Sequence, residues 1–222
     1  MKSIKLIYLF ILILCGCAFP ETYDILIKNG TIVDGSGKTS YIGDVGINAD
    51  TIAAIGNLNA KGNLEIDATG LVVAPGFINM LSWATVSLIE DGKSQSDIRQ
   101  GVTLEVFGEG WSMGPLNDKM KEQSLKDQGD IKYDIEWTTL AEYLQFLVDK
   151  GISPNVASFV GATTLRILTV GYEDRAPTKE ELESMKSMVK QAMEEGALGV
   201  GSSLIYAPAF YSTTEELIEL CK

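Results

Sequence analysis

The sequence predicts an α/β protein in which a small β-rich domain precedes a longer region of alternating strands and helices. Of its 222 residues, 45% are apolar and 22% are charged, a composition that excludes a mostly disordered chain. Residues 23–75 contain short strand-like runs separated by turn residues, as in a small antiparallel sandwich. Over residues 76–222, strand patterns alternate with amphipathic helical patterns, which indicates a parallel sheet, either open or closed into a barrel.

The first residues have the pattern of an export signal. Two lysines precede an apolar run at residues 6–14, which is shorter than the about 20 residues that span a bilayer. Gly16 stands immediately before Cys17, as in a bacterial lipobox. We therefore expect residues 1–17 to be a signal peptide with a lipobox, and acylated Cys17 to anchor an exported lipoprotein to a bacterial membrane, periplasmic or on the cell surface. The alternative is a plain signal peptide in which Cys17 is incidental.

Strand and turn signals alternate through the β-rich domain. Apolar runs at residues 23–27 and 31–33 flank Asn29-Gly30, the strongest short hairpin signal. Further strand patterns, separated by short turns, cover residues 44–47, 51–55, 64–68 and 71–73. The sequence therefore predicts a hairpin at Asn29-Gly30 within the antiparallel sandwich.

Four strand patterns follow, and the first has little polar alternation, as expected for a strand buried on both faces. They cover residues 72–78, 102–107, 155–160 and 197–201. A closed barrel has eight strands and takes about 250 residues. We therefore expect residues 76–222 to be the first half of a barrel, in an N-terminal fragment of a longer protein.

Helix signals lie between these strands. Apolar residues from Leu140 onward recur at helical spacing, and Gly151 ends that helix. Capping boxes begin two further helices and pair Thr178 with Glu181 and Ser212 with Glu215.

Charge and residue usage exclude several function classes. The formal net charge is −12, from 18 Lys and Arg against 30 Asp and Glu, which disfavours a nucleic-acid partner. The sequence has no histidine, so this chain cannot hold a His-ligated metal, a Ser-His-Asp triad or a histidine base. Its three cysteines are too few for a disulfide scaffold.

Three stretches carry a family resemblance. Residues 23–35 (YDILIKNGTIVDG) and 66–78 (IDATGLVVAPGFI) resemble the opening of amidohydrolase-superfamily enzymes. Residues 161–208 narrow the match and resemble the N-acyl-D-amino-acid deacylases, or D-aminoacylases. The resemblance implies a (β/α)₈ metal-hydrolase barrel, of which this chain would hold the N-terminal part, plus a small β-sandwich domain. It also implies hydrolysis of an amide bond on a D-amino acid, as in N-acyl-D-amino acids, with a small N-acyl amino acid or peptide as the partner.

The sequence departs from the family pattern at the metal ligands. The family has Asp-x-His-x-His after Gly-Phe-Ile, and Asn79, Leu81 and Trp83 stand at those three positions. Gly110 stands where the family has a cysteine in a Gly-Asn-Cys-Gly turn, and Ala162 where it has a histidine after the third strand. We therefore expect no metal ligands within this chain. Zinc is possible in a full-length protein, because the remaining ligands of the family lie further along the chain.

The resemblance leaves three candidate site residues. Tyr206 matches a tyrosine that helps to hold the substrate carboxylate; the alternative is packing under the loop at Pro208. Arg166 also matches the family, as a substrate-binding residue or as a structural residue that bridges loops, the interpretation we favour. Glu109 lies beside the lost cysteine position and is a replacement ligand, a general base or, as we favour, a solvated loop carboxylate.

Two aromatic side chains lie near the lost ligands. Trp83 and Trp111 form an aromatic wall of a pocket in one interpretation, and fill the vacated metal space in the one we prefer.

Two functions fit these observations. The first is an amidohydrolase-like hydrolase of non-peptide amide C–N bonds, inactive as this chain alone. The second is a non-catalytic ligand-binding lipoprotein on a scaffold that has lost its metal site.

Overall fold

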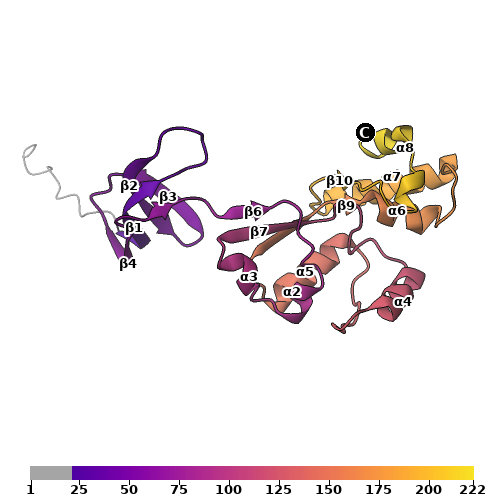
Figure 1. Ribbon diagram of the computed structural model, residues 1–222, viewed down its shortest axis with the longest axis horizontal. Coiled ribbons are helices and arrows are strands. Elements are labelled where there is room, and N and C mark those ends of the chain that lie inside the picture. Colours follow the sequence, from indigo (N-terminus) through magenta and orange to yellow (C-terminus); the bar gives the residue numbers. More distant parts are fainter. Residues whose placement is uncertain (1–21) are drawn as a thin grey trace, which may run out of the picture. The chain divides into compact units, whose positions relative to one another are not determined.

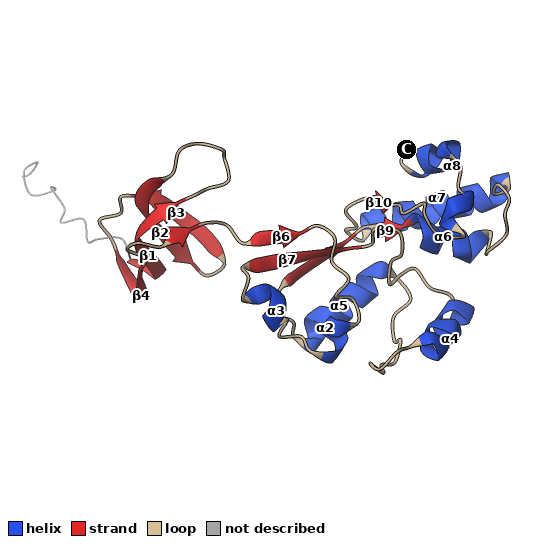
Figure 2. Ribbon diagram, in the orientation of Figure 1, coloured by secondary structure: helices blue, strands red, loops and turns tan. Residues whose placement is uncertain are grey.

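The computed structural model describes residues 22–222, and the chain divides into two units between Pro75 and Gly76 (Figure 1). The first unit is built from strands, whereas the second combines strands and helices (Figure 2). The fold is thus mixed α/β with open sheets. The predicted signal peptide and the acylation of Cys17 lie outside the described residues.

The first unit contains one five-stranded sheet with the order β3-β2-β1-β4, and β5 also pairs with β1. Its strands are β1 (Thr22–Ile32), β2 (Tyr41–Asn48), β3 (Thr51–Gly56), β4 (Lys61–Asp67) and β5 (Val72–Val73). The prediction of an antiparallel arrangement is wrong in part. β2 pairs with β1 and β3 in antiparallel fashion, but β4 and β5 run parallel to β1. The second layer of the predicted sandwich stays a prediction.

Asn29-Gly30 does not form the predicted hairpin. β1 continues through both residues, and its pairing with β2 shifts register between Ile27 and Gly30. Asn29 has a φ of 60°, and its backbone N–H donates to Asp44 Oδ1 at 2.9 Å. A type I′ turn and a β-bulge both use a residue with positive φ, which asparagine tolerates, so the same dipeptide marks either one.

The second unit contains two short parallel sheets. One has the order β6-β7-β8, and in the other β9 pairs with β10. Their strands are β6 (Phe77–Asn79), β7 (Val102–Phe107), β8 (Asn155–Ser158), β9 (Val160–Gly161) and β10 (Val200–Gly201). The strand predicted at 102–107 is confirmed. The strand predicted at 72–78 is split between β5 and β6, and the one at 155–160 is split between β8 and β9.

Helices follow the strands of the second unit. They are α2 (Ser87–Glu90), α3 (Gln95–Ile98), α4 (Asp118–Asp127), α5 (Leu140–Lys150), α6 (Ala162–Thr169), α7 (Lys179–Glu194), the 3₁₀ turn η1 (Ala209–Tyr211) and α8 (Thr214–Leu220). Gly151 ends α5 with a φ of 87°, and the Thr178 capping box opens α7, as predicted. The last helix is capped by Thr213 rather than Ser212, because the Thr213 hydroxyl accepts from the Glu216 N–H.

One face of the β6-β7-β8 sheet is covered by α2, α3 and α5 (Figure 1). Phe107 of β7 packs there with Tyr143 and Leu147 of α5 in the hydrophobic core. Trp137 joins this core, and its ring centroid lies 5.1 Å from that of Tyr143. This packing fixes the strands whose carboxyl ends form the candidate site. Among residues 22–222, the helices lack the combination of length and apolar character needed to cross a bilayer.

Candidate functional site

The turns at the carboxyl ends of β7, β9 and β10 touch through glycine backbones. Gly108 and Gly110 follow β7, whereas Gly161 and Gly201 end β9 and β10. A Cβ added to Gly161 would overlap the Gly110 backbone, and one added to Gly201 would overlap the Gly108 backbone. The Gly110 carbonyl also accepts the Thr163 N–H at 3.1 Å. Glycine thus brings three strand ends to one place, which is the end where α/β barrels build their active sites. We name residues 108–111, 161, 201 and 203 the strand-end site.

No side chain fits at Gly110 without a shift of its neighbours. A Cβ built there would lie 2.8 Å from Ser203 Cβ and 3.0 Å from the Ser203 backbone nitrogen. Gly110 stands at the position of the family cysteine. The structure therefore closes the space in which a thiolate would project.

The end of β6 presents two large apolar side chains. Leu81 is 52% exposed and Trp83 is 67% exposed, whereas Ser82 between them is buried. The Ser82 N–H donates to the Val106 carbonyl at 2.9 Å, which holds this segment beside β7. Neither exposed side chain carries an atom that binds a metal cation.

A buried carboxylate lies beneath this segment, and sequence reasoning missed it. Glu105 has no exposed surface, and its two oxygens accept the hydroxyls of Ser82 at 2.7 Å and Ser94 at 2.9 Å. Within the part of the chain that the structure describes, it forms no ion pair with Lys or Arg. The sequence feature that could have revealed it is a single charged residue within the otherwise mostly apolar strand VTLEVF.

Tyr143 lies near Glu105 and is also buried. Burial raises the pKa of the nearby Tyr143, and the charges of Tyr133 and Glu105 act in the same direction. The Tyr143 hydroxyl donates to the Thr85 carbonyl at 2.8 Å. Hydrogen bonds from Ser82 to Glu105 and from Tyr143 to Thr85 thus hold the segment after β6 in place.

The residues at these strand ends do not fit a metal ion. Residues 22–222 contain no group of three or more His, Cys, Asp or Glu that could hold one. Glu105 already accepts two hydroxyls, and Glu109 is the exposed carboxylate of the strand-end site. A single carboxylate does not make up the four ligands of a zinc site. The roles of Glu109 as ligand or base stay predictions.

Tyr206 lies in the segment that follows β10. Its side chain is 68% exposed, so it does not pack beneath the loop at Pro208. Its backbone carbonyl accepts the Phe210 N–H at 3.0 Å, which anchors the segment to η1. The phenol is accessible, and its contact with a substrate carboxylate stays a prediction.

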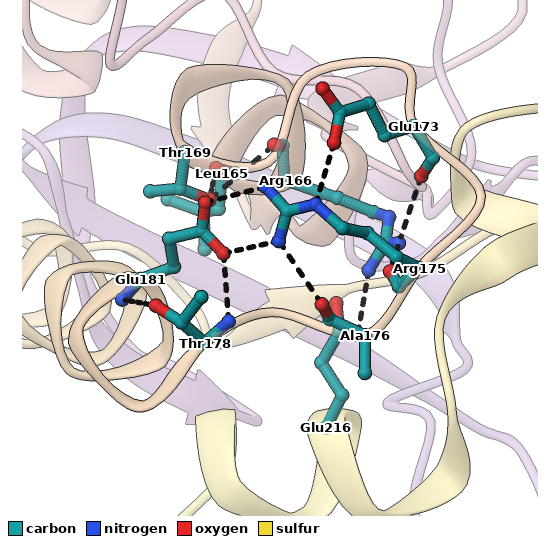
Figure 3. Close-up of polar contacts among 9 residues, drawn as sticks. All are labelled: Leu165, Arg166, Thr169, Glu173, Arg175, Ala176, Thr178, Glu181 and Glu216. Carbon is teal, nitrogen blue, oxygen red and sulfur yellow. Dashed lines mark hydrogen bonds and ion pairs between the residues drawn. The ribbon is translucent and has the colours of Figure 1, made fainter.

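Arg166 is buried and lies in a network of charged side chains, of which Glu216 is also buried (Figure 3). Its Nη1 donates to Glu216 Oε2 of α8 at 2.7 Å, and its Nη2 donates to the carbonyls of Glu173 and Arg175. Arg175 in turn donates to both oxygens of Glu181 at 2.6 and 2.7 Å. We name Arg166, Arg175, Glu181 and Glu216 the Arg166 clamp.

The Arg166 clamp joins α6, the following loop, α7 and α8. The hydrogen bonds from Arg175, with those from the Thr178 N–H, lower the pKa of Glu181 to about 2. The guanidinium of Arg166 is fully buried, so in this structure it supports the loop and α8. A substrate contact by Arg166 stays a prediction.

Searches against known proteins agree on one group of relatives. No protein-family model matches the chain. A D-aminoacylase of Alcaligenes xylosoxydans xylosoxydans is 36% identical over 207 residues, which cover 91% of this chain and 42% of the relative. An N-acyl-D-aspartate deacylase of the same organism is 32% identical over 205 residues, 91% of this chain and 41% of the relative.

Solved structures give the same result. A crystal structure of D-aminoacylase superposes with a TM-score of 0.75 at 31% identity, covering 90% of this chain and 42% of that one. An N-acyl-D-glutamate deacylase from Bordetella bronchiseptica, solved with zinc and a phosphonate inhibitor, has a TM-score of 0.77 at 30% identity, covering 90% and 42%. Another D-aminoacylase structure has a binuclear metal centre.

These matches agree with the fold and with the converging strand ends. They show that the chain is homologous to enzymes of the amidohydrolase superfamily. Within that superfamily it is homologous to the D-aminoacylases and N-acyl-D-amino-acid deacylases over about nine-tenths of its length. This confirms the resemblance found in the sequence. The chain spans about two-fifths of the length of these relatives.

Proposed function

We propose that this chain is part of a hydrolase that cleaves the amide C–N bond of N-acyl-D-amino acids. The observation that carries the proposal is the 36% identity to a D-aminoacylase over 91% of the chain. In the proposed reaction, water adds to the acyl carbon, the C–N bond breaks, and the amine leaves with a proton. The products are a carboxylate and a free D-amino acid.

In this proposal the described residues bind and orient the substrate. Tyr206 donates a hydrogen bond to the substrate carboxylate, an assignment supported by the exposure of its side chain. Glu109 takes a proton from the attacking water, since its exposed carboxylate lies in the strand-end site. Zinc is possible in a full-length protein, but the described residues do not fit it, so none of the roles proposed for them involves a metal.

The test is turnover by the full-length gene product and by the 222-residue chain, with N-acetyl-D-leucine and N-acetyl-L-leucine as substrates. We expect turnover of the D-enantiomer by the full-length protein alone, with zinc measured by atomic absorption. Binding of the D-substrate without turnover or metal would overturn the proposal and favour a non-catalytic binding protein.

A variant of Tyr206 refines the test. We expect Tyr206→Phe to raise KM about tenfold, because it removes one hydrogen bond to a charged group. Tyr41→Phe is the matched control, since Tyr41 is also exposed but belongs to the first unit. Equal KM values for the two variants would remove Tyr206 from the substrate site.

We also propose that the protein is exported and held on a membrane through acylated Cys17. The support is the lipobox pattern at the start of the sequence. Incorporation of labelled palmitate in the wild type and its loss in Cys17→Ser would support this location. Labelling that persists in the variant would contradict it.

A further inference from the structure

A cavity of about 860 Å³ lies beside the strand-end site. Its walls come from α4 and the loop after it, from the end of α6, and from the segments that follow β6 and β7. Small-molecule sites in proteins have volumes of about 300–1,000 Å³. The cavity is therefore large enough for a substrate group, and neither the hydrolytic step nor the carboxylate contact uses it.

Three aromatic side chains, Trp111, Tyr133 and Tyr172, line the cavity together with polar side chains. Trp111 is 43% exposed and Tyr172 is 63% exposed, so both have surface available to a ligand. Tyr133 is held in place because its ring stacks on Trp137 at 6.2 Å. Such rings favour contact with planar or bulky apolar groups.

The charged groups of the cavity disfavour an anion. Lys119 is accompanied by Asp127 and Asp130, so the wall carries more negative than positive charge. The Gln123 amide donates to Asp127 Oδ2 at 2.8 Å, and the Gln128 amide donates to the Tyr133 carbonyl at 2.6 Å. Both amides are thus committed to ordering α4 and its loop. The occupant suited to these walls is uncharged and carries an aromatic or bulky group that contacts the rings.

The cavity and the segment that carries Tyr206 both adjoin Gly110. Trp111 follows Gly110 directly, and Ser203, three residues before Tyr206, lies against Gly110. An N-acyl-D-amino acid has a free carboxylate at one end and an uncharged acyl group at the other. Gly110 thus adjoins Trp111 of the cavity along the chain and Ser203 of the segment that leads to Tyr206.

We infer that this cavity is the acyl-group subsite, and that it takes an aromatic or similarly bulky uncharged acyl group in preference to acetyl. The inference rests on the proposed function. The Trp111 and Tyr172 rings contact the acyl group, while its amide lies at the strand-end site.

The test compares kcat/KM of the full-length protein for N-phenylacetyl-D-leucine and N-acetyl-D-leucine. We expect Tyr172→Ala to lower the value for the phenylacetyl substrate about tenfold and to leave the acetyl substrate within about twofold, and Trp111→Ala to lower the phenylacetyl value by a similar factor. Leu125→Ala is the control, since Leu125 is exposed on α4 without lining the cavity. Equal losses for both substrates, or no loss for either, would overturn the inference.

Direct binding separates this inference from the proposed function. Phenylacetamide, phenylacetate and acetamide are titrated into the 222-residue chain and followed by NMR line broadening. Binding of phenylacetamide that weakens in both aromatic variants supports the subsite chemistry, even if no N-acyl-D-amino acid is turned over. Equal binding of phenylacetate, or no binding of phenylacetamide, overturns it, whatever the turnover assay shows.

Discussion

The Arg166 clamp and the strand-end site hold their segments together in different ways: the clamp uses charged side chains, and the strand-end site uses glycines. The clamp buries a fully enclosed arginine and pairs it with Glu216 and two backbone carbonyls. The strand-end site brings backbones together through glycines and presents the Trp111 ring to solvent. The clamp therefore depends on charge, whereas the strand-end site depends on the absence of side chains. The difference shows that a framework can be held by one region while the chemistry of another changes.

The largest effect is expected from breaking the clamp. Arg166→Ala leaves the Glu216 carboxylate buried without its partner, which should cost about 3–5 kcal/mol of unfolding free energy. Urea unfolding of the 222-residue chain measures the loss. Arg99→Ala, at an exposed arginine, serves as the control and should change little. A loss below about 1 kcal/mol in Arg166→Ala would mean that the clamp is not what holds α8.

Removal of the buried carboxylate should have the next largest effect. Glu105→Ala leaves the hydroxyls of Ser82 and Ser94 without their acceptor and opens a cavity, at a cost of about 2–3 kcal/mol. The same unfolding measurement applies, with the exposed Glu90→Ala as control. Stability equal to that of the control would show that the two serines find other partners.

Restoring a cysteine tests whether the strand-end site is closed. Gly110→Cys overlaps Ser203, so we expect a loss of about 1–3 kcal/mol and no gain of bound zinc. Gly129→Cys is the control, because nothing lies within 4 Å of a Cβ there. Stoichiometric zinc in Gly110→Cys, measured by atomic absorption, would refute the closed geometry.

The smallest expected effect is a pH dependence of the stability that Glu181 contributes to the Arg166 clamp. The pKa of Glu181 falls from its ordinary 4.5 to about 2 in the folded chain, chiefly through its hydrogen bonds with Arg175. A carboxyl whose pKa is depressed by folding stabilises the fold above its unfolded pKa. The contribution should therefore disappear as the pH falls from about 4.5 to about 2. The Tm difference between wild type and Glu181→Gln should narrow over that window, and a constant difference would contradict this account.

Local signals in the sequence predicted the elements that local interactions determine. The strand at 102–107, the helix ended by Gly151 and the cap at Thr178 all follow from patterns within a few residues. The bulge at Asn29 and the division of residues 155–160 between two sheets depend on pairing with distant strands. Sequence spacing carries little information about such pairing.

The candidate site was predictable where it matches a family motif and not where it departs from one. The motif located Gly110 and Tyr206, and one interpretation placed Trp111 in the wall of a pocket, but nothing in the sequence predicted Glu105 or the part that α4 plays in the cavity. Both depend on contacts between segments far apart in the chain: Ser82 with Glu105, and α4 with the end of α6. Such contacts appear only once the chain is folded.

The close packing of the glycines in the strand-end site limits where reactive side chains can be placed. Because Gly108, Gly110, Gly161 and Gly201 are packed too tightly to carry side chains, any functional group near them must come from a neighbouring position. Glu109 and Trp111 occupy two such positions and have exposed side chains. Redesign of this edge should therefore begin at residues 109 and 111, where a new side chain meets solvent instead of backbone.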